Sequence, residues 1–176
     1  EYNLILNANY DGSSTTASVV YGSVYGNALT TPERKGYSFV GWFTQSEGGE
    51  KITSGSDVSN QLGVGDTNTL YARWQANTYY LVFNGNGGTG TIERRELRYD
   101  EKFNLPGAAS FTRPGYEFSG WKIGEHTYEA DKQVSNLVAE DGWTLEVIAQ
   151  WAPISTTISF EGNGGDGERG SQSFTY

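Results

Sequence analysis

The chain has 176 residues and a formal net charge of −9, with 21 acidic and 12 basic side chains. A chain of this length forms one or two small domains, and because its acids are spread along it, its surface repels nucleic acid and anionic lipid. The absence of cysteine excludes disulfides, thiolate nucleophiles and thiolate metal sites. No apolar run approaches about 18 residues, so we expect no membrane insertion. The chain starts without Met or an apolar leader, and we therefore expect it to be a piece of a larger protein.

Three sequence blocks recur in the same order, which predicts a tandem repeat. The opening block occurs three times, 77 residues apart, at residues 2–9, 79–86 and 156–163. The middle and closing blocks occur twice each, at residues 36–42 and 115–121 and at residues 69–74 and 146–151. The predicted domains are a first repeat at 1–77, a second repeat at 78–152, and the opening hairpin of a truncated third repeat at 153–176.

The elements expected within each repeat are short strands. In chain order, the first repeat should hold strands at Leu4 and Leu6, at residues 19–21, at Tyr37 and Phe39, and at residues 70–74. The second repeat should hold strands at Leu81 and Phe83, at residues 97–99, at Tyr116 and Phe118, and at residues 145–151. Only residues 56–62 and 131–138 could form a short helix, because no long 3.6-residue period is present. The predicted fold class is mainly β, or α+β at most, with little helix.

Aromatic rings at matched positions should fill the small core of each repeat, since large rings bury the most area per ordered residue. Gly41 and Gly120 would let the backbone come close while Trp42 and Trp121 fill the space. The predicted structural motif comprises Gly36, Tyr37, Phe39, Gly41, Trp42, Tyr71 and Trp74, with Gly115, Tyr116, Phe118, Gly120, Trp121 and Trp151. The alternative is that one or two of the rings form an exposed platform for sugar stacking. Trp143 has no counterpart in the first repeat and is therefore the candidate contact residue.

The motif Gly-Tyr-Ser-Phe-Val-Gly-Trp at residues 36–42, followed by Leu-Tyr-Ala-Arg-Trp at 70–74, resembles the Listeria–Bacteroides repeat family, the B-repeats of internalin-type surface proteins. The second copy keeps the first motif and has Val147-Ile148 where Leu-Tyr would stand. The resemblance covers nearly the whole chain. It implies tandem β-grasp-like domains on an exported bacterial protein, often wall-anchored, with no catalytic residues. The first repeat departs from the Gly-rich start of the family, with Ala8-Asn9-Tyr10-Asp11 in its place.

Several motifs resemble nucleotide-binding, calcium-binding or catalytic motifs but lack the sequence context that these sites require. Residues 85–90 and 162–167 fit G-x-G-x-x-G, but a dinucleotide site needs a helix directly afterwards, and we expect hairpin tips instead. Asn163, Asp166 and Glu168 could be drawn around calcium, yet the second repeat does not maintain these residues. His126, the only histidine, is expected in an exposed turn without a nucleophile beside it. We therefore expect no catalytic residues, no cofactor and no metal site.

Charged side chains give no reactive cluster either. Scattered acids do not supply the paired carboxylates of a glycosidase cleft. Arg94, Arg95 and Arg98 alternate with Glu93 and Glu96, which suggests a ladder of ion pairs across two strands. The lysines fall at unmatched positions, which argues against an internal Lys–Asn crosslink.

The third opening hairpin, residues 156–176, lacks a domain of its own. Because an isolated two-stranded hairpin is marginal in water, we expect it either to dock on the preceding repeat or to make a homotypic contact by edge pairing with another copy of the chain.

The leading functional hypothesis is a structural or interaction module that acts as a stalk or spacer at the bacterial cell surface, with adhesion as a further role. Tandem repeats touch mainly their neighbours, and the linkers at residues 75–78 and 152–155 are short. The alternative is a carbohydrate-binding module that uses exposed aromatics, and a hydrolase ranks third. The expected partner is a protein or glycan at the cell surface, and nucleic acid is excluded by the charge.

Overall fold

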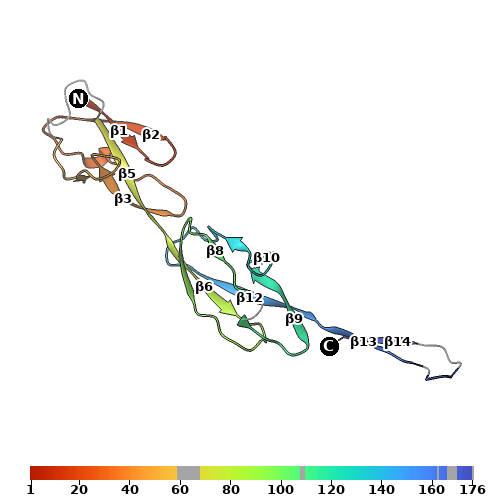
Figure 1. Cartoon of the computed structure of the whole chain (residues 1–176). Helices are drawn as coiled ribbons and strands as arrows, with labels where there is room; N and C mark the ends of the chain where they lie inside the picture. The colour runs from red at the N-terminus through yellow and green to blue at the C-terminus, as the bar shows by residue number, and fades with distance from the viewer. Residues whose placement is uncertain (59–67, 108–109, 162, 166–169, 176) are drawn as a thin grey trace. The chain divides into compact units, whose positions relative to one another are not determined.

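The computed structural model describes residues 1–58, 68–107, 110–161, 163–165 and 170–175. In this part of the chain the fold is mainly β without an α-helix, and the one helical turn is the 3-10 segment η1 (Gly26–Ala28). The chain divides into two compact units (Figure 1). Unit 1 holds β1 (Tyr2–Asn7), β2 (Ser14–Val19), β3 (Tyr37–Phe43), β4 (Lys51–Ile52) and β5 (Asn68–Ala76). Unit 2 holds β6 (Thr78–Asn84), β7 (Arg95–Arg98), β8 (Phe103–Asn104), β9 (Tyr116–Ile123), β10 (His126–Tyr128), β11 (Gln133–Val134), β12 (Thr144–Pro153), β13 (Ser155–Ser159) and β14 (Ser171–Thr175).

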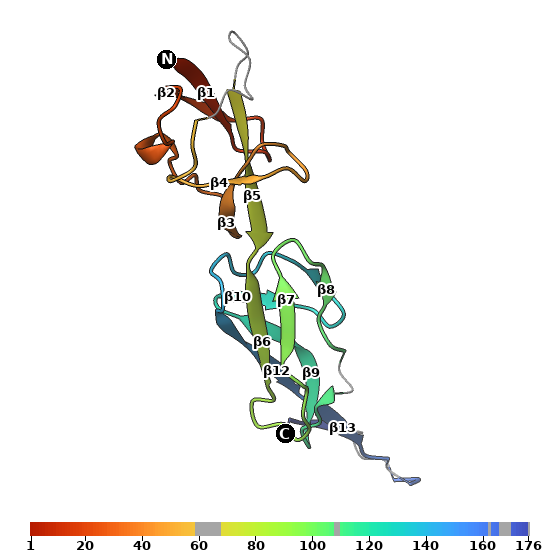
Figure 2. The same ribbon diagram turned by 90° about the vertical axis from the view of Figure 1, so that its left-hand side faces the viewer.

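Each unit contains a five-stranded mixed sheet with the same arrangement. The strand order is β2-β1-β5-β3-β4 in unit 1 and β7-β6-β12-β9-β10 in unit 2. The closing strand, β5 or β12, lies at the centre of its sheet. It runs parallel to the opening strand on one side and antiparallel to the middle strand on the other. Figure 2 shows the same strands from a second direction. The closing strand is paired along both edges, and its burial alternates along the strand, with Leu70 and Ala72 buried in unit 1 and Val147 and Ala149 in unit 2.

One face of each sheet carries the core. In unit 1, Leu4, Leu70 and Trp42 are buried together, and in unit 2, Leu81, Val147 and Trp121 occupy the matched places. The core of unit 2 also includes Val134 of β11 and Leu105, which directly follows β8. Alternate residues point to opposite faces of a strand, which is why the period-two pattern of the sequence marks these residues.

The Gly-Trp pair in the middle strand sits at a β-bulge. The pairing register of the middle and closing strands shifts by one residue just before Gly41 in unit 1 and Gly120 in unit 2. Both glycines have positive φ, 148° and 137°. A Cβ on Gly120 would collide with the Tyr128 carbonyl oxygen of the edge strand β10, and one on Gly41 would collide with the Lys51 side chain of β4. The bulge and the close edge strand together account for a glycine at this position.

The predicted strands are present, with shifted bounds in two places. The partner of the first strand lies at 14–19 and not at residues 19–21, and its counterpart in unit 2 begins at Arg95. The small-residue run Ser14-Thr15-Thr16-Ala17 hid this strand from a search for apolar alternation, although the run pairs residue for residue with β1.

The helix candidate at residues 131–138 is wrong. Asp131 and Asn136 have positive φ values of 59° and 54°, and residues 133–134 form β11 instead. The Asn136 side chain donates to the Asp100 carboxylate at 2.7 Å and accepts from the Asp100 backbone N–H, so long-range polar bonds hold this segment in a non-helical conformation. In the other candidate, residues 56–58 are not helical, because Asp57 bridges Val24; the rest of it lies outside the described residues.

The third opening hairpin forms its own two-stranded sheet, in which β13 pairs with β14 and every residue of both strands is exposed. Ile158 and Phe160 expose 47% and 56% of their surface, whereas Leu4 and Leu81, at the positions matched to Ile158, are fully buried. The described part of the hairpin therefore does not lie on the core of unit 2. Homotypic pairing through residues 156–176 stays a prediction.

Candidate functional site

The most elaborate side-chain arrangement in both units joins the opening loop to the closing strand. In unit 2, the indole N–H of Trp151 donates to the Gly85 carbonyl at 2.9 Å. The Asn86 side chain donates to the Ala149 carbonyl at 2.9 Å, while its backbone N–H donates to Oδ1 of Asn84 at 2.9 Å. Asn86 has a φ of 49°, a left-handed conformation that asparagine tolerates.

Unit 1 repeats this arrangement with matched residues. Trp74 donates to the Ala8 carbonyl at 2.7 Å, and the Asn9 side chain donates to the Ala72 carbonyl at 3.1 Å. Asn9 has a φ of 60°, and Asn163 in the third opening block has a φ of 38°. We call Asn86 with Trp151, and Asn9 with Trp74, the Asn–Trp pairs. They fasten the opening loop to the central strand.

A second arrangement surrounds each of these indoles, and we call it the aromatic–arginine cluster: Arg34, Tyr37, Phe39 and Trp74 in unit 1, and Arg113, Tyr116, Phe118 and Trp151 in unit 2. The Arg34 guanidinium lies 3.6 Å from the Tyr37 ring centroid, and the Arg113 guanidinium lies 4.0 Å from that of Tyr116. In unit 2, Phe118 meets Trp151 edge to face at 5.7 Å. These rings are half-buried, so each cluster has a face toward the core and a face toward solvent.

The tryptophans of the predicted motif take two different places. Trp42 and Trp121 are buried, with 4% and 0% of their surface exposed, and their indole N–H groups donate to the carbonyls of Thr30 and Pro106. Trp74 and Trp151 are half-buried at the end of the sheet. Trp143 is exposed over 56% of its surface.

The remaining motif residues support these rings. Gly36 and Gly115 have positive φ in the turn before the middle strand, and their carbonyls accept hydrogen bonds from the Asn77 and Ile154 backbones. Tyr71 is half-buried on the closing strand, opposite Phe43.

His126 is on the edge strand β10 and not in a turn, because the turn is formed by residues 124–125. It is exposed, and its ring lies 6.5 Å from that of Tyr128. An exposed edge-strand histidine beside a tyrosine does not form a nucleophile–base pair.

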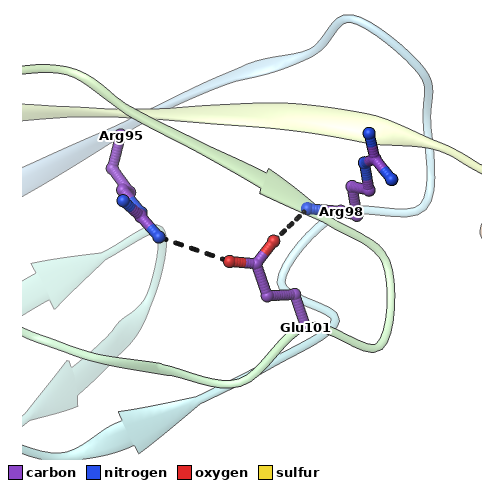
Figure 3. Close-up of polar contacts among 3 residues, drawn as sticks. All are labelled: Arg95, Arg98 and Glu101. Carbon is purple, nitrogen blue, oxygen red and sulfur yellow. Dashed lines mark hydrogen bonds and ion pairs between the residues drawn. The ribbon is translucent and has the colours of Figure 1, made fainter.

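The charged residues of β7 are arranged differently from the predicted ladder. Glu101 binds both arginines of the strand: its carboxylate lies 3.4 Å from an Nη of Arg95 and accepts the backbone N–H of Arg98 at 3.0 Å (Figure 3). Arg94 stacks on the Tyr80 ring at 3.7 Å. The ladder with Glu93 and Glu96 is wrong because the turn after β7 brings Glu101 back along the strand. An exposed pair of this kind contributes at most about 1 kcal/mol.

The Gly-rich segment at residues 85–90 is a turn. Thr89 exchanges two backbone hydrogen bonds with Thr112, and the next element is the strand β7. The segment at 162–167 and the residues Asp166 and Glu168 lie largely outside the described residues. Within the described residues, no group of three or more His, Asp or Glu side chains could hold a metal ion, and no helix is long and apolar enough to cross a membrane.

Comparison with known families decides the identity of these matched units. The model of the Listeria–Bacteroides repeat domain matches residues 2–73 and again residues 79–140. The chain belongs to the Listeria–Bacteroides repeat family. The first family match lies within unit 1 and the second lies within unit 2 except for residues 139–140. This repeat family is typical of non-enzymatic surface proteins.

Relatives of this repeat chain come from two bacteria. Internalin H of Listeria monocytogenes is 31% identical over 63% of the chain. Two proteins of Evansella cellulosilytica, whose names call them a membrane protein and a Gly-rich membrane protein, are 32% and 29% identical over 77% and 94% of the chain. The chain spans 18–19% of the length of each relative.

The sequence did not predict the structural roles of two recurring residue types, an asparagine and an arginine. Asn9 and Asn86 recur 77 residues apart, and Arg34 and Arg113 recur 79 apart, each two residues before a Gly-Tyr. The recurrence was visible in the alignment of the blocks. The carbonyl partners of Asn9 and Asn86 lie 63 residues away along the chain and could not be read from the sequence. The ring partners of Arg34 and Arg113 lie near them in sequence, at Tyr37 and Tyr116.

Proposed function

We propose that this repeat chain is a spacer of an exported bacterial surface protein, that its units resist tension along the chain, and that it carries no catalytic role. The observation that carries the proposal is the parallel pairing of first and last strands. In unit 1 the pairing runs from Leu4 opposite Asn68 to Asn7 opposite Tyr71. In unit 2 it runs from Tyr80 opposite Thr144 to Asn84 opposite Ile148.

The direction of these strands determines how a unit responds to force. When neighbouring strands are parallel, the beginning of the first and the end of the last lie at opposite ends of the pair. A pull on the two chain ends then slides the strands past each other, and several hydrogen bonds between them have to break together. Forced unfolding is governed by the unfolding rate, which is low when many bonds must break in one step.

The chain segments that leave the two five-stranded sheets support transmission of tension. Only Asn77 separates β5 from β6, and only Ile154 separates β12 from β13. Each of these residues is bonded to the turn before the middle strand of the preceding sheet, because the Asn77 N–H donates to the Gly36 carbonyl and the Ile154 N–H to the Gly115 carbonyl, both at 2.9 Å. No flexible linker is present to absorb extension at these points.

The strand order also supports the β-grasp-like assignment. An opening hairpin, a crossover and a closing strand inserted beside the first strand in parallel give the order seen in both sheets. The crossover contains no α-helix among its described residues. The surface location is supported by the internalin and membrane-protein names of the relatives.

Single-molecule pulling tests the proposal. A cysteine at the exposed Ser155 and a tag at the N-terminus give defined attachment points, because the natural chain has no cysteine. We expect two unfolding events of similar high force, each releasing about 25 nm of chain, at about 3.3–3.6 Å for each of roughly 75 residues. Extension at low force without distinct events would contradict a tension-resisting spacer.

The exposed Trp143 favours glycan contact as a second candidate function, since an exposed aromatic face can stack on a sugar ring. Titration of the chain and of a Trp143→Ala variant with wall and host glycans, followed by tryptophan fluorescence, tests it. A response lost in the variant supports glycan binding; no response to any glycan in the natural chain rejects it.

A further inference from the structure

The two aromatic–arginine clusters differ in one respect, which is whether a tyrosine from the opening loop covers the cluster. In unit 1, the Tyr10 ring meets Trp74 edge to face at 5.7 Å, with the planes at 90°. The Arg34 guanidinium lies 4.8 Å from the Tyr10 centroid as well as 3.6 Å from that of Tyr37. The Tyr10 hydroxyl donates to the Glu33 carbonyl at 3.2 Å.

Unit 2 has no such ring, because Gly87 stands 77 residues after Tyr10, at the matched position of the opening block. A Cβ on Gly87 would lie 3.6 Å from the guanidinium carbon of Arg113. Gly87 therefore lies beside Arg113, as Tyr10 lies beside Arg34 in unit 1. Glycine has no side chain that could contact the guanidinium.

The cluster of unit 2 borders a groove of about 690 Å³, and the walls of this groove include Arg113, Tyr116, Phe118, Trp151 and Ile154. Arg113 and Trp151 are the counterparts of Arg34 and Trp74, which contact Tyr10 in unit 1. The groove thus presents the aromatic edges and the guanidinium that an aromatic ring contacts in the other copy of the same fold.

We propose that this groove binds an aromatic side chain of a partner protein, in the place that Tyr10 fills in unit 1. The structure of unit 1 supplies the chemistry: a ring edge-on to the tryptophan and beneath the guanidinium, held by aromatic and cation–π contacts. In unit 1, Tyr10 already occupies the place beside Trp74 and Arg34. The proposed interaction surface is therefore confined to unit 2.

The groove also sets which aromatic residues fit. In unit 1 the tyrosine hydroxyl has the Glu33 carbonyl as its acceptor. The counterpart carbonyl, of Thr112, already accepts from both the backbone N–H and the hydroxyl of Thr89, at 2.7 and 3.2 Å. Both lone pairs of that oxygen are engaged. Phenylalanine and tyrosine side chains should therefore bind with similar affinity.

Indole N–H signals in NMR spectra give a direct readout, because the chain has five tryptophans and each gives one signal. The natural chain is titrated with N-acetyl-phenylalaninamide, with N-acetyl-tyrosinamide and with N-acetylglucosamine. We expect saturable shifts of the Trp151 signal with both aromatic amides at similar concentrations, with little change at Trp74. Arg113→Ala should weaken binding about two- to fivefold, in line with one lost cation–π contact, whereas Arg34→Ala should leave it unchanged.

Tyr10→Ala provides the reciprocal test without disturbing unit 2. Removing this partly exposed ring should open the groove of unit 1, so that the Trp74 signal gains the same saturable shift. Equal shifts of Trp74 and Trp151 in the natural chain, or no shift of Trp151 up to the solubility limit, would overturn the proposal. A Trp151 shift with the sugar and not with the amides would also overturn it and would identify a glycan site.

Discussion

At the scale of single residues, the conformation of Asn9 and Asn86 explains how a short loop is fixed against the sheet. A left-handed backbone turns the chain, and the side chain then reaches a carbonyl of the central strand. Asn163 adopts positive φ in the third opening block, where no closing strand is paired with β13. The backbone conformation is therefore set locally, and the side-chain bond adds the connection to the sheet.

Asn86→Ala is predicted to lower the free energy of unfolding of unit 2 by about 2–3 kcal/mol. Roughly 1 kcal/mol comes from the lost hydrogen bond to Ala149 and about 1–2 kcal/mol from a left-handed alanine. Asn86→Gly is the matched control and should lose only about half as much, because glycine adopts positive φ without strain. Urea unfolding of the two variants measures the difference; equal losses would show that the backbone conformation does not matter.

Tyr79 provides a pH-dependent test of the core of unit 2. Burial raises the pKa of the Tyr79 phenol, and the charge of Glu101 adds to the effect. The neutral phenol is therefore favoured in the folded state, so its contribution to stability is complete below the ordinary tyrosine pKa of about 10 and is lost as pH rises through the higher folded pKa. We expect the free energy of unfolding to fall above pH 10, and to fall less steeply in Tyr79→Phe.

The same variant should be tolerated at neutral pH. The Tyr79 hydroxyl is buried and makes no hydrogen bond of full geometric quality among the described residues, although the Leu137 backbone lies close enough to oppose the burial-induced rise of its pKa. Removing the hydroxyl should therefore change the free energy of unfolding by no more than about 1 kcal/mol or should increase it. Unfolding followed at pH 7 and above pH 10 checks both statements. An unchanged slope in the variant would show that Tyr79 does not ionise during unfolding.

At the scale of elements, the middle strand of each sheet has a β-bulge at its Gly-Trp pair. The glycine permits the bulge and the approach of the edge strand, and the tryptophan after it enters the core. The neighbours of the two glycines differ: Gly120 faces a backbone carbonyl, and Gly41 faces the flexible end of a lysine.

Gly120→Ala should therefore be more damaging than Gly41→Ala. Both alanines would adopt an unfavourable positive φ, but a lysine side chain can move away whereas the Tyr128 carbonyl belongs to the paired strand β10. We expect losses of about 3 kcal/mol or more at Gly120 and about 1–2 kcal/mol at Gly41. Thermal unfolding of both variants measures the ranking, and a larger loss at Gly41 would contradict it.

The elements also show what could be predicted from this sequence. Recurrence of the blocks predicted two similar mainly-β units, and alternation at Leu4, Leu6, Tyr37 and Phe39 located strands correctly. The strand β2 was misplaced because its first residues, Ser14 to Thr16, are polar and exposed, and only Ala17 and Val19 pack on the core. The groove of unit 2 was not predicted, because it depends on the three-dimensional packing of residues 113–118. It also depends on the absence of a side chain at Gly87, beside Arg113.

At the scale of the whole molecule, two units of one topology follow each other in the chain, and one residue, Asn77, lies between their adjoining strands β5 and β6. Each unit places its entry and exit strands side by side and parallel. In the proposed spacer function, this arrangement transmits tension through the paired backbone of the two strands, and the matched rings stabilise the sheet that contains them. A binding surface can then differ between copies through a single loop residue without altering that arrangement.

The direction of the applied force tests this account most directly. In unit 2, a pull between the N-terminus and a cysteine at Trp143 acts on the beginning of β6 and the beginning of β12, which lie at the same end of the pair. The hydrogen bonds then separate one after another. We predict that unit 2 opens at a force several times lower with attachment at 143 than with attachment at 155, while unit 1 opens at the same force in both experiments. Equal forces for unit 2 in the two geometries would contradict the central claim that its parallel terminal strands resist tension.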